Sequence, residues 1–428
     1  MTIEAGVNLG GYLVDRYGWG DESCARRTAA LVRNNAADPG GSRGGYLREL
    51  TYRVGGVGRT ARGTGSNGWN GWGYIVNHYA STADLSRGKT GTFRTVLGGA
   101  HHAIHEFKVR MNPGGPVDAT VQWFFATGRS AVVYAISFDA TPAGPNVVNA
   151  DTRAPYGDLA FEGTSGPIAG VGWGDKYRFT TTGNGPVTAA TAWDYTQPNT
   201  VPYVRMWSSA IDAEMGAVQT QTFEQHVGGG DYGGGLLASA CWTKTSANKG
   251  ANCSKAGETM PQDWLWPFQL NQYELPFVDS SHRLAWGSTF GTIGQSSVSA
   301  FGKTLSGYPK VSYSVLMVVD KHSTNATLEQ VSSVERMLGA EVTGGSWNPT
   351  WACWDSSAST VTLNPSAGAV SAPIFRFTAF SAAQLTAVTL GGVPLAPGDY
   401  FASVDAANQT LWLTLNGTVT GPVTLQVQ

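Results

Sequence analysis

Apolar and polar residues alternate with a period of two along much of this chain, a pattern typical of β-strands. The clearest example is residues 101–138, where three alternating runs are separated by turn sequences at 112–116 and 127–130. This pattern predicts three adjacent antiparallel strands. In the first run, His102 lies on the opposite face from His105.

The same reading predicts elements in the rest of the chain. LEQVSSVERML (328–338) has the apolar spacing of a helix, and Ala25 to Asn34 is predicted as a second, short helix. YSVLMVVD (313–320) is apolar enough to be a strand that is buried on both faces. Further strands are predicted over 46–54, 74–78, 172–180, 187–195, 201–209, 217–226 and 284–290.

The predicted fold class is all-β. Charged residues become rare after residue 358, and the remainder reads as six or seven short strands separated by Gly, Pro and Asn turns. We therefore expect a large antiparallel β-supersandwich domain over 1–358 and a small Ig-like β-sandwich over 359–428. A β-propeller in place of the large sandwich is the alternative, although no block repeats at a fixed period.

Composition narrows the possible partners. Only 14% of the 428 residues are charged, the net charge is -2 and no Lys/Arg run occurs, which disfavours a nucleic-acid partner. No apolar run approaches the ~18 residues of a membrane span. The chain is expected to be a monomer that meets a polysaccharide or oligosaccharide.

Four cysteines bear on localisation. The first residues show no basic region followed by an apolar stretch, so no signal peptide is visible. The cysteine spacing fits no zinc pattern, and disulfides between Cys241 and Cys253 and between Cys24 and Cys353 are expected. These disulfides would indicate a secreted protein.

Aromatic residues suggest a ligand class. The chain has 15 Trp and 16 Tyr, and such rings beside glycine present flat apolar surfaces that suit sugar rings. Trp69 and Trp72 lie in a Gly-rich segment. They form either a rim that stacks on a sugar or anchors that hold this segment on the core. The strand at 201–209 has a Tyr/Arg/Trp face, which is either exposed surface or the floor of a cleft. The candidate substrate-binding residues are Trp69, Trp72, His78, Tyr134, Asp158, Tyr203, Trp207 and Gln221.

The mixture of His, Tyr and Arg suits β-elimination next to a uronic acid. Arginine neutralises the carboxylate, a base with a pKa near 7 removes the adjacent proton, and an acid protonates the leaving oxygen. The candidate neutralisers are Arg153 and Arg205, and His102 is the candidate base, with His78 as second choice. Tyr156 or His226 is the candidate acid. Each also has an ordinary structural explanation, such as an ion pair of Arg153 with a neighbouring aspartate.

Other chemistries stay open. A glycoside hydrolase would need two facing carboxylates, for which Asp158 and Glu224 are candidates, and a non-catalytic glycan-binding protein would need the aromatic residues alone. No metal site or cofactor is predicted, because His101-His102-Ala-Ile-His105 on a strand splits its histidines between two faces. A Ca²⁺ ion at acidic loop residues such as Asp231 is an alternative, although the spacing matches no EF-hand.

The long paired strands VQWFFATGR and VVYAISFD, followed by YSVLMVVDKH and a helix, resemble the galactose-mutarotase-like supersandwich of several polysaccharide lyases. The resemblance covers residues 40–340 and is one of architecture. The order His102, Tyr134, Arg153, Arg205 also resembles lyases that release rhamnose from glucuronic acid, which are propellers. These resemblances imply a polysaccharide-cleaving enzyme.

Overall fold

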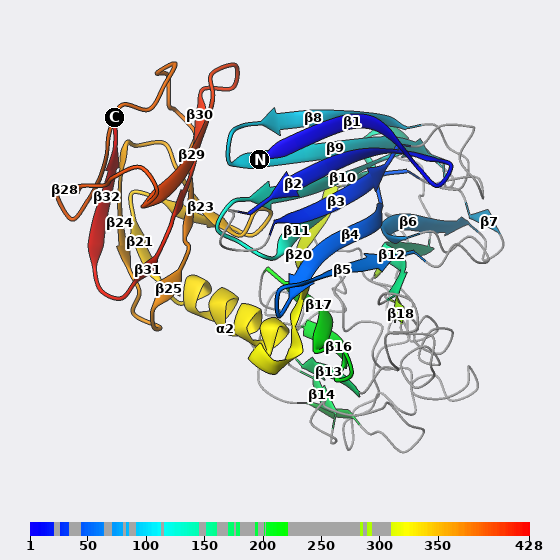
Figure 1. The fold of residues 1–428 in the computed structure, drawn as a ribbon. Coiled ribbons are helices and arrows are strands. Elements are labelled where there is room, and N and C mark those ends of the chain that lie inside the picture. The colour runs from blue at the N-terminus through cyan, green and yellow to red at the C-terminus, as the bar shows by residue number, and fades with distance from the viewer. Residues whose placement is uncertain are drawn as a thin grey trace.

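Two antiparallel sheets are stacked face to face and form the main body of the protein, which we call the large sandwich (Figure 1). The computed structural model describes residues 1–20, 26–33, 44–63, 71–79, 83–84, 91–112, 115–144, 151–160, 170–174, 177–179, 193–195, 201, 203–220, 283–285, 289–292 and 310–428. At some strand positions, among them 74, 76–79 and 151–158, only the backbone is described.

Among the described residues, ten strands form the first sheet. Its order is β1 (Thr2–Leu9), β2 (Tyr12–Trp19), β3 (Arg27–Val32), β4 (Leu47–Val54), β5 (Val57–Arg62), β12 (Asp151–Ala160), β6 (Trp72–Tyr79) and β7 (Ala83–Asp84), and β18 (Arg283–Ala285) and β19 (Thr289–Thr292) also pair with β12.

The second sheet has eight strands in the part of the chain that the structure describes. Its order is β13 (Gly170–Gly174), β16 (Tyr203–Ser208), β17 (Ala213–Gln219), β20 (Lys310–Lys321), β11 (Val132–Asp139), β10 (Val117–Ala126), β9 (His102–Met111) and β8 (Thr92–Gly98). A separate ribbon pairs β14 (Tyr177–Phe179) with β15 (Trp193–Tyr195). The short 3-10 turn η1 (Thr141–Ala143) follows β11.

One apolar core fills the space between the two large sheets. It takes Tyr17 and Leu31 from the first sheet and Phe107 and Trp123 from the second. Strand β20 is buried on both faces, as predicted, because Val315, Met317 and Val319 enter this core while Leu316 and Val318 enter a second core on the other side. These layers confirm the predicted all-β sandwich rather than the propeller alternative.

The second core lies outside the eight-stranded sheet. There the turn η6 (His322–Thr324) and helix α2 (Ala326–Leu338) follow β20, and α2 packs on β16, β17 and β20. The chain then forms two five-stranded sheets, the C-terminal sandwich (Figure 1).

One sheet of the C-terminal sandwich has the order β21 (Glu341–Thr343), β24 (Thr360–Asn364), β32 (Val423–Val427), β27 (Val388–Leu390) and β28 (Val393–Pro394). The other has the order β22 (Ser346–Asn348), β23 (Cys353–Ser356), β26 (Ile374–Phe377), β30 (Thr410–Leu415) and β29 (Tyr400–Asp405), with β23 and β26 parallel. The strands β25 (Val370–Ser371) and β31 (Thr418–Val419) form a separate pair. The C-terminal sandwich therefore begins near residue 341, before the expected boundary at 358.

The predicted helix at Ala25 to Asn34 is wrong. Residues Arg27–Val32 form β3, which pairs with β2 and β4. Alanine, leucine and arginine favour helices, but this preference is weak, and burial of the segment on both faces outweighs it. The predicted helix at 328–338 is confirmed as part of α2.

Candidate functional site

Three of the predicted site residues come together where β6 pairs with β12. The backbone register pairs His78 with Asp151, Val76 with Arg153, and Tyr74 with Tyr156. Directly paired positions of an antiparallel sheet lie on the same face. His78, Arg153 and Tyr156 therefore occupy neighbouring positions on one face of the ten-stranded sheet.

This face is the outer one. Ile75 belongs to the core between the sheets, so the alternate positions 74, 76 and 78 fall on the opposite face. The register shifts by one residue between Arg153 and Tyr156 and again between Tyr156 and Gly157. Gly73, with φ +99°, lies at the second shift, and a Cβ at this position would come within 2.6 Å of Trp123. Glycine is thus required at this bulge, which sets which β6 residues face outward.

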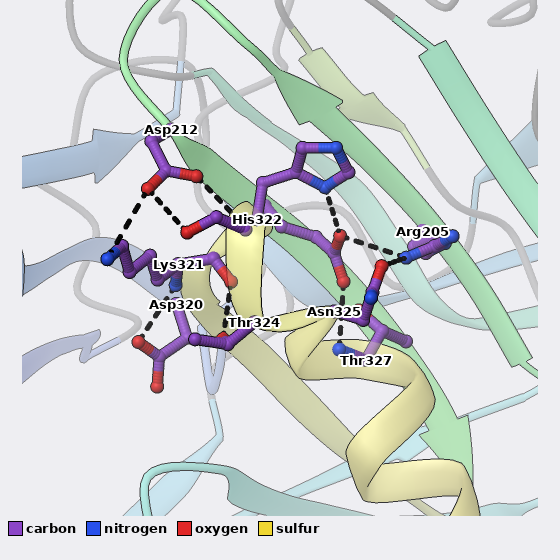
Figure 2. A network of polar contacts seen from close by, with 10 residues as sticks. Arg205, Asp212, Asp320, Lys321, His322, Thr324, Asn325 and Thr327 are labelled. Atoms are coloured by element: carbon purple, nitrogen blue, oxygen red, sulfur yellow. Dashed lines mark hydrogen bonds and ion pairs between the residues drawn. The ribbon is translucent and has the colours of Figure 1, made fainter.

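A second polar cluster surrounds the buried carboxylate of Glu214 on β17. Figure 2 shows the surrounding residues, among them Arg205, His322 and Thr327. Oε2 of Glu214 lies 2.7 Å from Nδ1 of His322 and 3.2 Å from a guanidinium nitrogen of Arg205. Its Oε1 accepts a hydrogen bond of 2.8 Å from the backbone N–H of Thr327 in the first turn of α2. The carboxylate thereby joins β16, β17, η6 and the helix.

The chemistry open to this cluster follows from its burial. The imidazole of His322 is 24% exposed and stacks on Trp207 with ring centroids 4.7 Å apart. A carboxylate behind a partly exposed imidazole is a general acid–base arrangement. However, Glu214 also holds the N-terminus of α2, whose unpaired N–H groups need acceptors. The described contacts therefore assign the cluster a structural role as well.

Arg205 belongs to this cluster, and this position contradicts the prediction that Arg205 neutralises the carboxylate of a substrate. It is buried, donates to Glu214 and to Oδ1 of Asn325, and its guanidinium carbon lies 4.9 Å from the centre of the Trp207 ring. Helix α2 packs against β16, and Tyr203 packs against the second core. The Tyr/Arg/Trp face of this strand is thus covered by the helix and is not the floor of a cleft.

His102 is also in the wrong place for its predicted role. Its side chain is fully buried between the eight-stranded sheet and the C-terminal sandwich, where its ring nitrogens lie 3.1 Å from Oγ of Ser403 and 2.8 Å from Oγ1 of Thr414. Burial lowers the pKa of His102 to about 3. A sugar cannot reach this imidazole, so the structure contradicts the prediction of His102 as the base.

Two predicted sugar-binding aromatics are core residues. Trp72 and Tyr134 are fully buried, and their rings pack 5.6 Å apart in the core between the sheets. Both are therefore inaccessible to a ligand. For Trp72, the alternative reading of an aromatic anchor in a Gly-rich segment is the one observed.

Five predicted residues lie outside the described part of the chain: Trp69, Gln221, Glu224, His226 and Asp231. For four others only the backbone is described: His78, Arg153, Tyr156 and Asp158. The expected Cys241–Cys253 disulfide also lies outside the described part. Cys24, the expected partner of Cys353, lies outside it as well, and Cys353 itself is a free, buried thiol. Burial raises the pKa of this thiol, so it is unreactive.

Sequence reasoning missed Glu214 and His322. The available signal was a single acidic residue inside the apolar run AEMGAV, since a buried carboxylate needs partners. Of these partners, Arg205 is nine residues away, whereas His322 lies 108 and Thr327 lies 113 residues further along the chain. The spacing of residues along the sequence therefore carried no information about the pairing of Glu214 with His322.

Within the described ranges, no group of three or more His, Cys, Asp or Glu side chains is arranged to hold a metal ion. No helix in the same ranges has the length and apolar character needed to cross a membrane. No protein-family model matches the sequence, and no relative was found among curated proteins.

Proposed function

We propose that this protein is a secreted, carbohydrate-active enzyme that cleaves a polysaccharide beside a uronic acid by β-elimination. The reacting residues are those on the outer face of the ten-stranded sheet where β6 pairs with β12. The observation that supports the proposal is the register that brings a histidine, an arginine and a tyrosine to three consecutive same-face pairs of two strands.

Each residue type has a defined task in this reaction. Arg153 pairs with the uronate carboxylate and stabilises the negative charge that develops on it. His78 removes the proton from the carbon next to the carboxylate, and the electron pair forms a carbon–carbon double bond as the glycosidic C–O bond breaks. Tyr156 donates its proton to the leaving oxygen. The products are a new chain end and an unsaturated uronate.

The test is a continuous absorbance assay near 235 nm on a panel of polyuronates, which detects the double bond. Arg153→Ala is expected to lower the rate by about 10²–10³, the usual cost of removing one preorganised charge-stabilising group. Arg53→Ala is the matched control, because Arg53 is exposed on the neighbouring strand β4 and donates to the Gly56 carbonyl at a turn.

Tyr156→Phe removes the acid and is expected to cost about 10²–10⁴ in rate. Saturated reducing sugars without absorbance would overturn the elimination proposal and favour hydrolysis by carboxylates. An equal loss of rate in Arg53→Ala and Arg153→Ala would show that the reaction does not depend on the positions where β6 pairs with β12.

A further inference from the structure

A hollow of about 740 Å³ lies on the outer face of the eight-stranded sheet, over β8, β9, β10, β11 and β20. Alternate residues of these strands, such as Phe107, Val121 and Phe138, fill the core beneath it. The C-terminal sandwich covers a different part of this face, around Ile104 and Phe124. The hollow is therefore the uncovered part of the sheet beside the junction of the two sandwiches.

The floor of the hollow is a row of small hydroxyl side chains. Thr120, Ser137 and Ser312 are direct register partners on three adjacent strands. The same row continues through Lys108 to Thr92 on β8. No hydrogen bond links the hydroxyls of Thr120, Ser137 or Ser312 to another described group. Five strands at a spacing of about 4.8 Å give a track of about 19 Å that crosses the strands.

A row of charged side chains stands beside this floor. Arg110, Asp118, Asp139 and Lys310 are register partners on the same strands, two residues from the hydroxyl row. Arg110 forms a bidentate pair with Asp118, with both distances 2.6 Å, and Lys310 lies 3.3 Å from Asp139. These long side chains make one wall of the track.

The cations extend further into solvent than the carboxylates. The side chains of Lys108, Arg110 and Lys310 are 50%, 62% and 71% exposed, whereas those of Asp118 and Asp139 are 42% and 37% exposed. Three cations and two carboxylates line the hollow, and Nζ of Lys108 also lies 3.3 Å from Oε1 of Glu106 beside it. Its most exposed groups are thus cationic heads above a hydroxyl floor, which suits a chain that carries both carboxylates and hydroxyls.

We infer that this track is a second, non-catalytic binding site, which holds an extended acidic glycan chain. The chain lies across the strands, its hydroxyls hydrogen-bond to the Thr120, Ser137 and Ser312 row, and its carboxylates pair with Lys108, Arg110 and Lys310. The site lies on the outer face of the other sheet from β6 and β12, so it does not depend on the proposed elimination.

Isothermal titration of the full chain with a galacturonate hexamer tests the inference. The Arg153→Ala background is used so that cleavage of the hexamer is slowed by about 10²–10³ during the titration. Ser137→Trp fills the floor, and the double variant Lys108→Ala with Lys310→Ala removes two cations. Thr424→Trp is the matched control, because Thr424 is an exposed strand hydroxyl on β32 of the C-terminal sandwich. Circular dichroism checks that every variant is folded.

We expect both track variants to lose one bound hexamer per chain or to bind it at least tenfold more weakly, and the control to bind like its parent. Binding to the parent should weaken as salt is added, since exposed cations are screened. Unchanged binding in both track variants would overturn the inference. So would equal affinity for a neutral hexasaccharide, or for single-stranded DNA of similar charge. Hexamer binding without any unsaturated product from the wild-type chain would overturn the elimination proposal alone.

Discussion

A neutral imidazole at His102 holds the junction between the two sandwiches. Oγ of Ser403 accepts hydrogen bonds from the backbone N–H groups of both His101 and His102, so its own proton is available for the ring nitrogen Nδ1 of His102. The other ring nitrogen then donates to Thr414. This pattern is satisfied only by the neutral ring, and protonation would leave a buried charge without a carboxylate partner among these contacts.

The two buried histidines of β9 should make the stability of the protein depend on pH. Burial lowers the pKa of His102 to about 3 and that of His105 to about 4, whereas an unfolded histidine titrates near 6.5. The unfolded chain therefore binds more protons than the folded one below pH 6.5. The free energy of unfolding should fall as the pH drops from 6.5 towards 4, by up to roughly 1.4 kcal/mol per pH unit for each histidine.

Urea denaturation at several pH values measures this slope. His102→Gln cannot titrate and should flatten the slope by up to one proton, at the cost of some stability at pH 7. His101→Gln is the control at a half-buried neighbouring position and should keep most of the slope, because His102 still titrates. A His102→Gln slope equal to that of the wild type would show that this imidazole is not the acid-sensitive group.

The alternation along β9 predicted correctly which residues share a face, but not what lies over that face. His105, Phe107 and Val109 face the core between the sheets, and His102 lies on the opposite side, as the pattern indicated. The C-terminal sandwich covers one end of that opposite face and leaves Lys108 open at the other. A period of two cannot distinguish these cases, because cover is supplied by residues about 300 positions away.

At the scale of elements, α2 depends on one carboxylate. Asn325 precedes the helix in the left-handed conformation (φ 52°), and its side chain makes no capping hydrogen bond to the helix. Glu214 from β17 instead accepts the hydrogen bond from Thr327, and its negative charge lies at the positive end of the helix dipole. The start of the helix is therefore fixed by a strand residue 113 positions earlier.

Glu214→Ala should lower the free energy of unfolding by about 3–5 kcal/mol, because it removes the carboxylate that forms a buried ion pair with the Arg205 guanidinium. Glu329→Ala removes an exposed glutamate from the first turn of the same helix and should cost only about 0.3–1 kcal/mol. Chemical denaturation of the two variants makes the comparison. Similar losses would mean that Glu214 acts through the helix dipole alone and not through a buried ion pair.

The face of β16 shows again that alternation identifies the residues of a face but not what covers it. The alternation predicts that Tyr203, Arg205 and Trp207 share a face, and this polar and aromatic face was expected to be either exposed surface or the floor of a cleft. Helix α2 was itself predicted from its apolar spacing, but its docking on β16 depends on Glu214 and His322. Sequence periodicity defines the elements and their faces, and contacts between distant segments decide which face stays open.

At the scale of the whole molecule, the boundary between the sandwiches was predicted too late in the chain. The composition shift follows residue 358, yet β21, β22 and β23 already belong to the C-terminal sheets. Trp351 and Trp354 continue the aromatic-rich composition of the large sandwich. They nevertheless pack in the second core with Trp412 and Phe375. Composition could not locate the boundary because both sides of it bury tryptophan.

The two sandwiches share this second core, so we expect the large sandwich to require the C-terminal sandwich in order to stay folded and soluble. Ile104, Phe124 and Val133 of the eight-stranded sheet pack in the same cluster as Trp351 and Trp412, and the Phe124 and Trp412 rings lie 4.8 Å apart. Removal of residues 341–428 would expose these side chains, each of which contributes about 1.5–3 kcal/mol when buried. An apolar patch on a sheet face promotes association between chains.

The truncated chain 1–340 should therefore aggregate, which soluble yield and sedimentation velocity would measure. The matched chain carries the same truncation with Ile104→Thr, Phe124→Thr and Val133→Thr, so that strand-compatible polar residues replace the exposed apolar ones. Higher solubility of this second chain would attribute aggregation to the uncovered patch. If the unmodified truncated chain is monomeric and as stable as the full protein, the C-terminal sandwich is an independent module and the shared core contributes little to stability.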